Sequence, residues 1–317
     1  MLQFRAFHPS SLHWDEHIHT LSIPLPQPFR YEPNMNYLSR STNECLFVVD
    51  NSCIFKLLPL GDNQALIAVH SADEQMLRVQ IVHVSGETSL TFEQREEVAR
   101  YVWEWFDLGT DLEAFYEKGE GDPLLHGVTE SFYGLRLMGI PDLFEAMSWG
   151  IIGQQINLAF AYTLKRRLVE AFGTSLTWEG RTFWTFPTPE RIAALTTEDL
   201  TALQFTGKKA EYLIGVASLM ADGTLSKAGL LDIGDFLAME KELLRIRGIG
   251  PWTANYVLMR CLRNPAAFPL ADVGLHNALK HVLGLAQKPS LDQIRALAIG
   301  WQGWEAYATF YLWRVLY

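Results

Sequence analysis

The feature that most constrains the fold is the ten-residue stretch "IRGIGPWTAN", residues 246–255. Gly248 and Gly250 flank an isoleucine, and Pro251 then opens a run of apolar residues at helical spacing. A proline is well placed in the first turn of a helix, and glycines can adopt the positive φ that tight turns need. The stretch therefore predicts two helices joined by a short turn whose backbone N–H groups are uncovered.

An uncovered turn that leads into a helix is suited to binding an anion. The N–H groups of the turn and the dipole of the second helix both attract negative charge. Arg245, Arg247 and Arg260 add positive charge near it in the sequence. A nucleic-acid phosphate fits such a site, because contact with the phosphate backbone requires no particular base sequence. A purely structural helical hairpin is the alternative interpretation.

The distribution of charge along the chain supports the phosphate interpretation. The formal net charge is −10, which on its own argues against nucleic-acid binding. Residues 241–317, however, contain nine Lys and Arg against four Asp and Glu, a net charge of +5, whereas the rest of the chain contains 17 against 32. The positive part of the chain therefore surrounds the glycine turn.

Length and composition exclude several classes of protein. A chain of 317 residues is long enough for two domains. It has no run of 18 apolar residues and no signal-peptide pattern, so we expect a cytoplasmic protein without membrane contact, and a monomer. Three cysteines are too few for a disulfide framework, an iron–sulfur cluster or a four-cysteine zinc site, and we expect no cofactor.

The residue pattern predicts an α+β fold in two domains. Residues 45–50, 65–70 and 77–84 have the character of strands, and residues 91–108 that of a helix; the proline-rich stretch 24–40 indicates a loop and a short helix at Asn34. From about Gly134 onward only helical patterns remain, beginning with 141–153 and 158–172. The polar, turn-rich stretch 117–123 suggests a boundary. We therefore expect a mixed α/β domain with an antiparallel sheet (residues 1–125) followed by an all-α domain (126–317).

Asp272 is the acidic residue that stands out. It follows a loop with two prolines, Pro265 and Pro269, and begins a helical pattern. An aspartate there usually caps the helix with its side chain. The same carboxylate could also act chemically, because amide donors at a helix start keep it ionised. The two roles are compatible.

Five segments, taken in order, resemble one family. They are 144–161 (FEAMSWGIIGQQINLAFA), 186–195 (FPTPERIAAL), 248–254 (GIGPWTA), 268–279 (FPLADVGLHNAL) and 303–314 (GWEAYATFYLWR). Together they resemble the DNA-3-methyladenine glycosylase II family of helix-hairpin-helix DNA glycosylases. The likeness covers about residues 134–317, and before that only 28–41 (PFRYEPNMNYLSRS) is similar.

The resemblance implies a monofunctional enzyme of base excision repair. Such an enzyme flips an alkylated purine, 3-methyladenine or 7-methylguanine, out of double-stranded DNA and hydrolyses its N-glycosidic bond. Residues 126–317 would be an all-α helix-hairpin-helix glycosylase domain. Asp272 would be catalytic: it would stabilise the oxocarbenium-like sugar and position water at C1′. Aromatic rings would hold the cationic base by stacking.

The resemblance also assigns the remaining site residues. The base pocket would be formed by Trp252, Tyr256, Trp313 and Tyr37, and the DNA wedge by Gln155 with Gln154. The DNA backbone would be bound by Gly248, Ile249, Gly250, Thr253, Arg247, Lys208 and Lys209. The backbone carbonyls of Leu244, Ile246 and Ile249 would hold a structural Na⁺ or K⁺. Trp304 and Tyr307 we assign instead to the core, and a solvated charge pair is the alternative for the two lysines.

Trp252 bears on the type of reaction. Family members that also cut the strand carry a lysine at this hairpin position to form a Schiff base. Here the residue is tryptophan, and no lysine lies between Lys241 and Lys280, so lyase activity is not expected. Two alternatives stay open: a glycosylase of the same fold acting on oxidised or deaminated bases, and a non-catalytic DNA-binding hairpin protein. The missing lysine argues against the 8-oxoguanine branch, and Asp272 against a non-catalytic hairpin.

Overall fold

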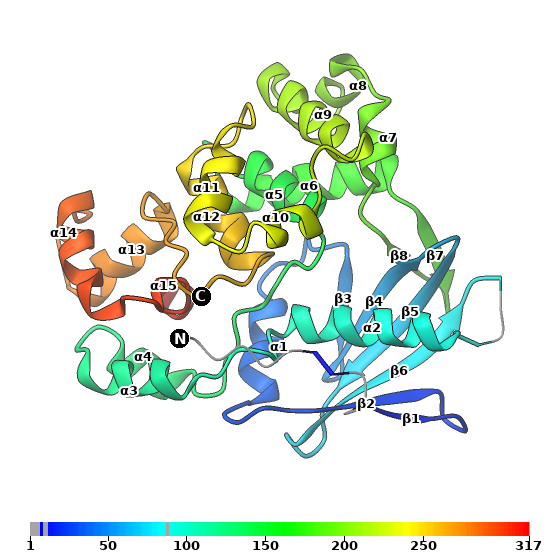
Figure 1. The fold of residues 1–317 in the computed structure, drawn as a ribbon, viewed down its shortest axis with the longest axis horizontal. Coiled ribbons are helices and arrows are strands. Elements are labelled where there is room, and N and C mark those ends of the chain that lie inside the picture. Colours follow the sequence, from blue (N-terminus) through cyan, green and yellow to red (C-terminus); the bar gives the residue numbers. More distant parts are fainter. Residues whose placement is uncertain (1–6, 9–11, 87–88, 317) are drawn as a thin grey trace.

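The computed structural model describes residues 7–8, 12–86 and 89–316. Its N-terminal part is built on a six-stranded antiparallel sheet in the order β1-β2-β6-β5-β4-β3 (Figure 1). The strands are β1 (His13–Asp15), β2 (Thr20–Pro24), β3 (Phe47–Asp50), β4 (Cys53–Leu60), β5 (Asn63–His70) and β6 (Met76–Val84). The short helix α1 (Tyr31–Leu38) connects β2 to β3 and begins three residues before the expected Asn34. The antiparallel sheet is as the sequence predicts, although the sequence pattern missed β1, β2 and β4.

Both faces of the sheet are covered. Helix α2 (Phe92–Trp105), which begins with a capping box at Thr91, packs on one face. Side chains alternate between the faces, as in any strand: Ile54 and Leu58 of β4 join the main core, whereas Leu57 packs with Phe183 on the other side. The sheet is therefore a middle layer between α2 and a segment from the second half of the chain.

That segment is a hairpin that the sequence pattern does not indicate. Residues from Gly134 onward were predicted to be helical throughout, but β7 (Ser175–Trp178) and β8 (Arg181–Trp184) form a two-stranded antiparallel hairpin. Glu179 and Gly180 both have positive φ, +47° and +74°, as a two-residue hairpin turn requires. Phe183 is buried against the sheet, so the hairpin exists because that apolar face needs a cover.

The rest of the second half is helical, as expected, and the α+β fold class is confirmed. Asp142 and Asn157 cap the first two helices after Gly134 through side-chain oxygens that accept backbone N–H groups. The helices are α3 (Glu113–Gly121), α4 (His126–Ser131), α5 (Leu143–Ile152), α6 (Leu158–Phe172), α7 (Pro189–Ala193), α8 (Thr197–Thr201), α9 (Gly207–Ala221), α10 (Lys227–Asp232), α11 (Phe236–Leu244), α12 (Pro251–Arg260), α13 (Val273–Val282), α14 (Leu291–Leu297) and α15 (Glu305–Trp313), with 3₁₀ turns at Ala298–Trp301 and Arg314–Leu316.

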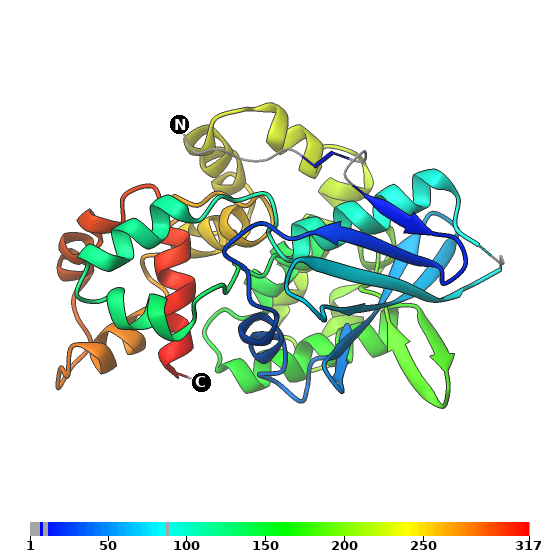
Figure 2. The ribbon, with the colours of Figure 1, turned by 90° about the horizontal axis from the view of Figure 1, so that it is seen from below.

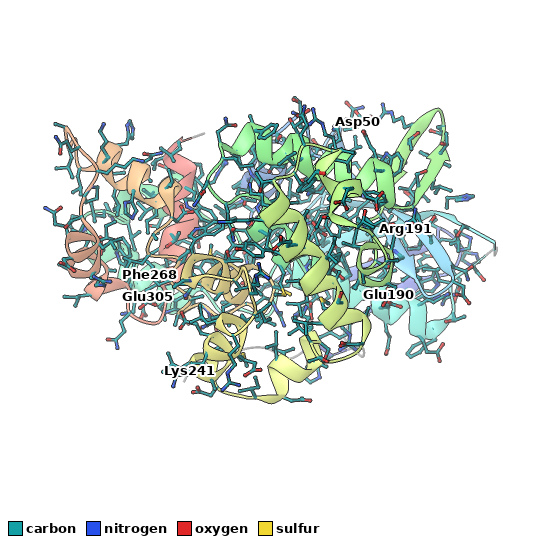
Figure 3. The ribbon with its side chains drawn as sticks, turned by 90° about the horizontal axis from the view of Figure 1, so that it is seen from above. Asp50, Glu190, Arg191, Lys241, Phe268 and Glu305 are labelled. Carbon is teal, nitrogen blue, oxygen red and sulfur yellow. The ribbon has the colours of Figure 1, made fainter. Side chains whose placement is uncertain are left out.

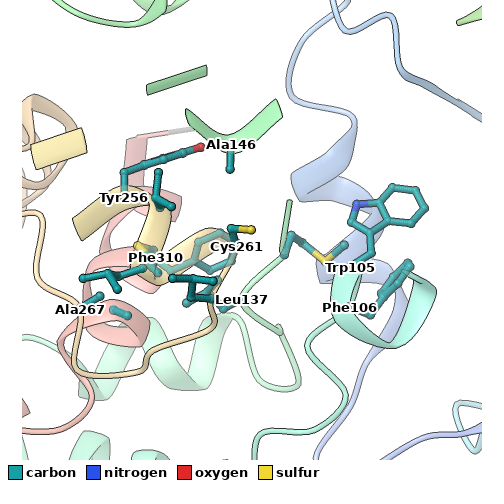
Figure 4. Packing of buried hydrophobic residues seen from close by; sticks show 14 of the residues in the cluster. Trp105, Phe106, Leu137, Ala146, Tyr256, Cys261, Ala267 and Phe310 are labelled. Atoms are coloured by element: carbon teal, nitrogen blue, oxygen red, sulfur yellow. The ribbon is translucent and has the colours of Figure 1, made fainter. Parts of the chain in front are cut away.

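One buried apolar cluster runs through both parts of the chain. Trp105 and Phe106, from the end of α2, belong to the same cluster as Tyr256 and Phe310 of the helical part (Figure 4). The ring of Tyr37 lies 4.6 Å from that of Phe310. Because the core is continuous, the proposed division at residue 125 stays a prediction.

Two helices that precede Gly134 pack against the last helix of the chain. Helices α3 and α4 lie beside α15 in both ribbon views (Figures 1 and 2), and the Tyr116 and Tyr311 hydroxyls are 2.7 Å apart. Trp304 and Tyr307 are 4% and 1% exposed and pack around Phe115, so their assignment to the core is confirmed. This packing fixes α15, which carries one wall of the cavity described next.

Candidate active site

The predicted helical hairpin is present between α11 and α12, and its two glycines do different things. Gly248 has φ +93°, and a Cβ there would overlap the ring of Tyr212, so both conformation and space require glycine. Gly250 has an extended φ of −95°, not the positive φ that the sequence suggested. It occupies the N-cap of α12, where a Cβ would meet no atom within 4 Å. Glycine at position 250 leaves the start of the helix bare.

The hairpin is tied to the turn that follows α5. The Gln154 side chain donates from Nε2 to the Gly248 carbonyl at 2.9 Å and to the Thr253 hydroxyl at 3.2 Å. Gly150 lets α5 approach closely, because a Cβ there would lie 2.6 Å from Cγ2 of Thr253. Gln155 is exposed and has φ +56°. Of the two predicted wedge residues, Gln154 is thus engaged within the protein and Gln155 is free to reach outward.

Asp272 caps α13, as predicted, and both of its carboxylate oxygens are engaged. Oδ1 accepts the backbone N–H of Leu275 at 2.7 Å and the indole N–H of Trp313 at 2.8 Å. Oδ2 accepts the indole N–H of Trp252 at 2.9 Å. The side chain is only 8% exposed. Three donors from three elements therefore hold the carboxylate in one orientation.

A cavity of about 940 Å³ opens beside this carboxylate. All four predicted pocket aromatics line it, and so do Asp272, Gln154 and Gln155. The rings of Trp252 and Tyr256 stack with centroids 5.4 Å apart. The full lining is Tyr37, Arg40, Trp149, Gly153, Gln154, Gln155, Ile156, Asn157, Leu158, Ala161, Trp252, Tyr256, Arg260, Ala271, Asp272, Val273, Gly274, Asn277, Trp313 and Leu316. Residues from α1, α5, α6, α12, α13 and α15 are thus brought to one place.

Two arginines line the cavity, and the sequence pattern predicts neither of them there. Arg260 lies at the far end of α12, about 15 Å from the hairpin turn, so it is not near the turn as its sequence position suggested. It is 4% exposed and donates to the Met138 carbonyl (2.6 Å) and to the Tyr256 hydroxyl (2.9 Å). Burial raises the pKa of the Tyr256 phenol more than Arg260 lowers it, so that hydroxyl keeps its proton.

Arg40 is the second arginine. It follows α1 and stacks on Tyr37, with its guanidinium carbon 3.9 Å from the ring centroid. The only available sequence signal was its position three residues after a predicted pocket tyrosine.

Of the side chains predicted to bind the DNA backbone, some lie on the surface and one lies in the interior. Lys208 and Arg247 are exposed, and Arg247 pairs with Glu211 at 2.8 Å. Lys209 is buried, and its ammonium donates to the carbonyl of Ile152 at 2.8 Å. A cation there stabilises the C-terminal end of α5. Lys209 therefore supports the turn that carries Gln154 and Gln155.

The carbonyls predicted to hold a monovalent cation lie at the hairpin turn. Leu244 ends α11, and the carbonyl of Ile246 already accepts the N–H of Ile249 at 3.0 Å. A carbonyl oxygen has a second lone pair, so this bond leaves room for a cation. Among the described residues, no group of three or more His, Cys, Asp or Glu side chains could hold a metal ion. No helix in the described part of the chain is long and apolar enough to cross a membrane.

Comparisons with known proteins identify the family. Residues 149–302 match the model of the HhH-GPD superfamily of base excision DNA repair proteins, and residues 19–147 match the N-terminal domain of 8-oxoguanine DNA glycosylase. The chain is 49% identical to the DNA-3-methyladenine glycosylase of Bacillus subtilis over 96% of its own length and 99% of the relative's. This protein therefore belongs to the HhH-GPD superfamily of base excision DNA repair proteins.

Two further relatives extend the comparison. A putative DNA-3-methyladenine glycosylase of Bacillus subtilis is 36% identical, over 88% of this chain and 90% of its own. The solved 3-methyladenine DNA glycosylase of Archaeoglobus fulgidus superposes with a TM-score of 0.78 at 24% identity, over 92% of this chain and 97% of the other. The second likeness concerns the fold alone.

Proposed function

We propose that this protein is a monofunctional DNA glycosylase of base excision repair that releases alkylated purines, 3-methyladenine and 7-methylguanine, from double-stranded DNA. The observation that carries the proposal is the Asp272 carboxylate, which two indole N–H groups and one backbone N–H hold at the side of an aromatic cavity. A helix cap alone needs only the backbone N–H. The names of the similar glycosylases support the substrate class.

The carboxylate would act on the sugar. As the bond from C1′ to the base nitrogen breaks, positive charge develops on the sugar ring, and a fixed carboxylate stabilises it. The same group would orient the water that adds to C1′ and accept its proton. An alkylated purine already carries a positive charge and leaves as a neutral base, so no strong acid is needed to protonate it.

The aromatic walls would hold the flipped base. Trp252 and Tyr256 already stack on each other, and Tyr37 and Trp313 face the same cavity. Electron-rich rings attract a cationic purine, which favours damaged over normal bases without specific hydrogen bonds. Gln155, exposed at the cavity rim, would fill the gap left in the duplex.

The hairpin would hold the DNA backbone. Gly248, Ile249, Gly250 and Thr253 surround the bare start of α12, where a phosphate gains from backbone N–H groups and from the helix dipole. The exposed side chains of Lys208 and Arg247 would add charge. Lys209 would act from within, by fixing the turn after α5. The carbonyls of residues 244, 246 and 249 would hold a monovalent cation, which would supply further positive charge to this phosphate site.

The enzyme would release the base without cutting the strand. No lysine lies among the described residues that line the cavity, and the indole N–H of Trp252 donates a hydrogen bond to Asp272. A Schiff base needs a free amine beside C1′. We further propose that the protein works as a monomer on chromosomal DNA in the cytoplasm.

Replacing Asp272 with asparagine tests the mechanism. Asparagine caps helices as well as aspartate does, so D272N should fold. It removes the negative charge, and the release of 3-methyladenine and 7-methylguanine from methylated DNA should fall by about 10²- to 10⁴-fold. Bases released under single-turnover conditions are measured by chromatography, and binding to damaged duplex by gel shift; binding should persist.

D235N is the matched control. Asp235 caps α11 in the same way, accepting the N–H of Ala238 at 2.8 Å, and is exposed outside the cavity. It should release bases at the wild-type rate. Undiminished release by D272N would rule out the mechanism, and equal wild-type activity on undamaged DNA would rule out the substrate class.

A further inference from the structure

The charged side chains that line the cavity lie at its two ends, with the acidic group at one end and the basic groups at the other. Among its lining residues, Asp272 is the acidic one, and Arg40 and Arg260 are the two that carry positive charge. Asp272 contacts Trp252, Trp252 stacks on Tyr256, and Arg260 reaches the Tyr256 hydroxyl. The aromatic wall therefore leads from the carboxylate at one end to the arginines at the other.

A smaller cavity continues behind that cationic end. It has a volume of about 40 Å³ and shares Tyr37, Arg40, Trp149, Tyr256 and Arg260 with the large one. A base that enters beside Asp272 and lies along the stacked rings would thus direct its far edge at the two guanidinium groups.

Arg40 has N–H donors that no described protein group accepts, and these could bind the far edge of the base. Its Nη1 donates to the carbonyl of Tyr37 at 2.8 Å, and this is the one hydrogen bond it makes within the described part of the chain. A guanidinium has five N–H donors in a planar fork. No ion pair joins Arg40 to a described residue, although the Glu44 carboxylate attracts its charge from farther away; the guanidinium carbon lies 3.9 Å from the Tyr37 ring centroid and 5.8 Å from that of Tyr162. Arg260 differs, because its Nε and Nη1 are both engaged within the protein.

A cationic end opposes one kind of base and favours another. The 3-methyladenine nucleoside is positively charged and carries an amino group at its 6-position, so a guanidinium repels its charge and meets donors instead of acceptors. A 6-oxopurine such as hypoxanthine is neutral and offers an acceptor at the same edge. Guanidinium donors match oxygen acceptors of this kind.

The difference between the two bases in their interaction with the guanidinium grows as the N-glycosidic bond breaks. For hypoxanthine, the C1′–N9 bond breaks with both electrons staying on the base, so the leaving base becomes an anion whose charge is shared with its oxygen. Water then adds to C1′ and loses a proton, and the base takes up one proton at a ring nitrogen. For 3-methyladenine the same bond cleavage only neutralises the positive charge. A guanidinium thus stabilises the transition state for the neutral substrate more strongly.

We propose that Arg40, which the N-terminal part of the chain supplies, is a specificity-determining residue: it donates to an acceptor on the far edge of the flipped base and favours release of hypoxanthine, a neutral deaminated purine, relative to cationic 3-methyladenine. The proposal rests on the proposed glycosylase function and deepens it. It also gives the N-terminal part a role in choosing the base, since Tyr37 and Arg40 both come from the α1 region.

The test compares two substrates in one variant. R40M keeps the length of the side chain but removes charge and donors. Single-turnover release of hypoxanthine from a defined duplex should fall about ten- to a hundredfold. Release of 3-methyladenine from methylated DNA should change by less than roughly threefold. Release of 7-methylguanine, which is cationic but has the 6-oxo group, should fall by an intermediate factor. R40K, which keeps the charge without the fork, should fall between wild type and R40M on hypoxanthine.

The matched control is R181M. Arg181 is an exposed arginine on β8 that pairs with Asp50 at 2.6 Å. Neither Arg181 nor Asp50 lines the cavity, and Asp50 lies apart from Phe268 and Glu305 in the side-chain view (Figure 3). R181M should leave all three release rates unchanged.

The outcomes separate the two proposals. If the wild-type protein releases none of the three bases, the proposed function fails. If it releases 3-methyladenine but no measurable hypoxanthine, or if R40M lowers the rates for hypoxanthine and 3-methyladenine by the same factor, the role of Arg40 is overturned and the glycosylase function stands. An R40M protein that loses 3-methyladenine release would show a structural role for Arg40 and would equally overturn its role in specificity.

Discussion

At the scale of single residues, the site depends on space as much as on charge. Gly274 is the third residue of the Asp272–Val273–Gly274 sequence that opens α13. A Cβ at position 274 would lie 2.9 Å from Oδ1 of Asp272 and 3.1 Å from the Trp313 indole. Both the carboxylate and the ring that donates to it would have to move. The glycine therefore allows the carboxylate and the indole to meet.

We predict that G274A separates activity from stability. Alanine is a better helix former than glycine by about 1 kcal/mol, but crowding Oδ1 and the indole costs about 1 to 3 kcal/mol, so the melting temperature should stay the same or fall slightly. Moving the carboxylate away from its position should lower the rate of base release about 10- to 100-fold. Single-turnover release and thermal unfolding are measured on the same preparation. Wild-type release by G274A would show that the position of Oδ1 is not critical.

Residue patterns located the carboxylate and the aromatic rings but not the arginines. Asp272 could be recognised because a proline-containing loop and a helical pattern adjoin it in sequence. Arg40 and Arg260 are 220 residues apart, and only the packing of α1 against α12 and α15 brings them to one cavity. Likewise, nothing in "KK" at 208–209 shows that one lysine faces solvent and the other donates to Ile152.

At the scale of elements, the helical hairpin of α11 and α12 could be predicted because the residues that define its turn are adjacent in sequence. Two glycines and a proline define the turn within four residues. The β7–β8 hairpin was missed because its strands are four residues each and their burial depends on a sheet more than a hundred residues earlier. A turn can thus be predicted from its own residues, whereas a short strand can be predicted only when the surface that it covers is known.

The two hairpin glycines give a paired prediction. G248A places a side chain at φ +93° and into the Tyr212 ring, so it should lower the free energy of unfolding by about 2 to 4 kcal/mol. G250A has an extended backbone and open space, so its stability should stay within about 0.5 kcal/mol of wild type. Any loss of DNA affinity in G250A then reports on access to the bare helix start. Urea unfolding measures the stability of each variant, and gel shift measures its DNA affinity. Equal destabilisation by the two variants would contradict this account.

At the scale of the whole molecule, a buried ion pair joins the N-terminal and helical parts. Lys165 of α6 lies 2.9 Å from Glu44, which precedes β3, and 3.8 Å from Glu145 of α5. Burial, the largest single influence, raises the pKa of Glu44, but the Lys165 ammonium, the backbone N–H of Leu46 and the Lys56 ammonium together hold that pKa below its ordinary value. Neither partner could be assigned from sequence, because they are 121 residues apart and belong to different parts of the chain.

We predict that K165M destabilises the protein through the carboxylate it leaves behind. An unpaired buried Glu44 should cost about 3 to 5 kcal/mol of unfolding free energy, and the double variant E44Q/K165M should recover most of it. The surface pair Arg295–Asp292 is the control, since R295M should cost less than about 1 kcal/mol. A carboxyl whose folded-state pKa is depressed contributes stability above its unfolded-state pKa and loses it as the pH falls through the folded value. The difference between wild type and K165M in urea unfolding should therefore shrink in acid. A double variant no more stable than K165M would show that the lysine acts by packing rather than by its charge.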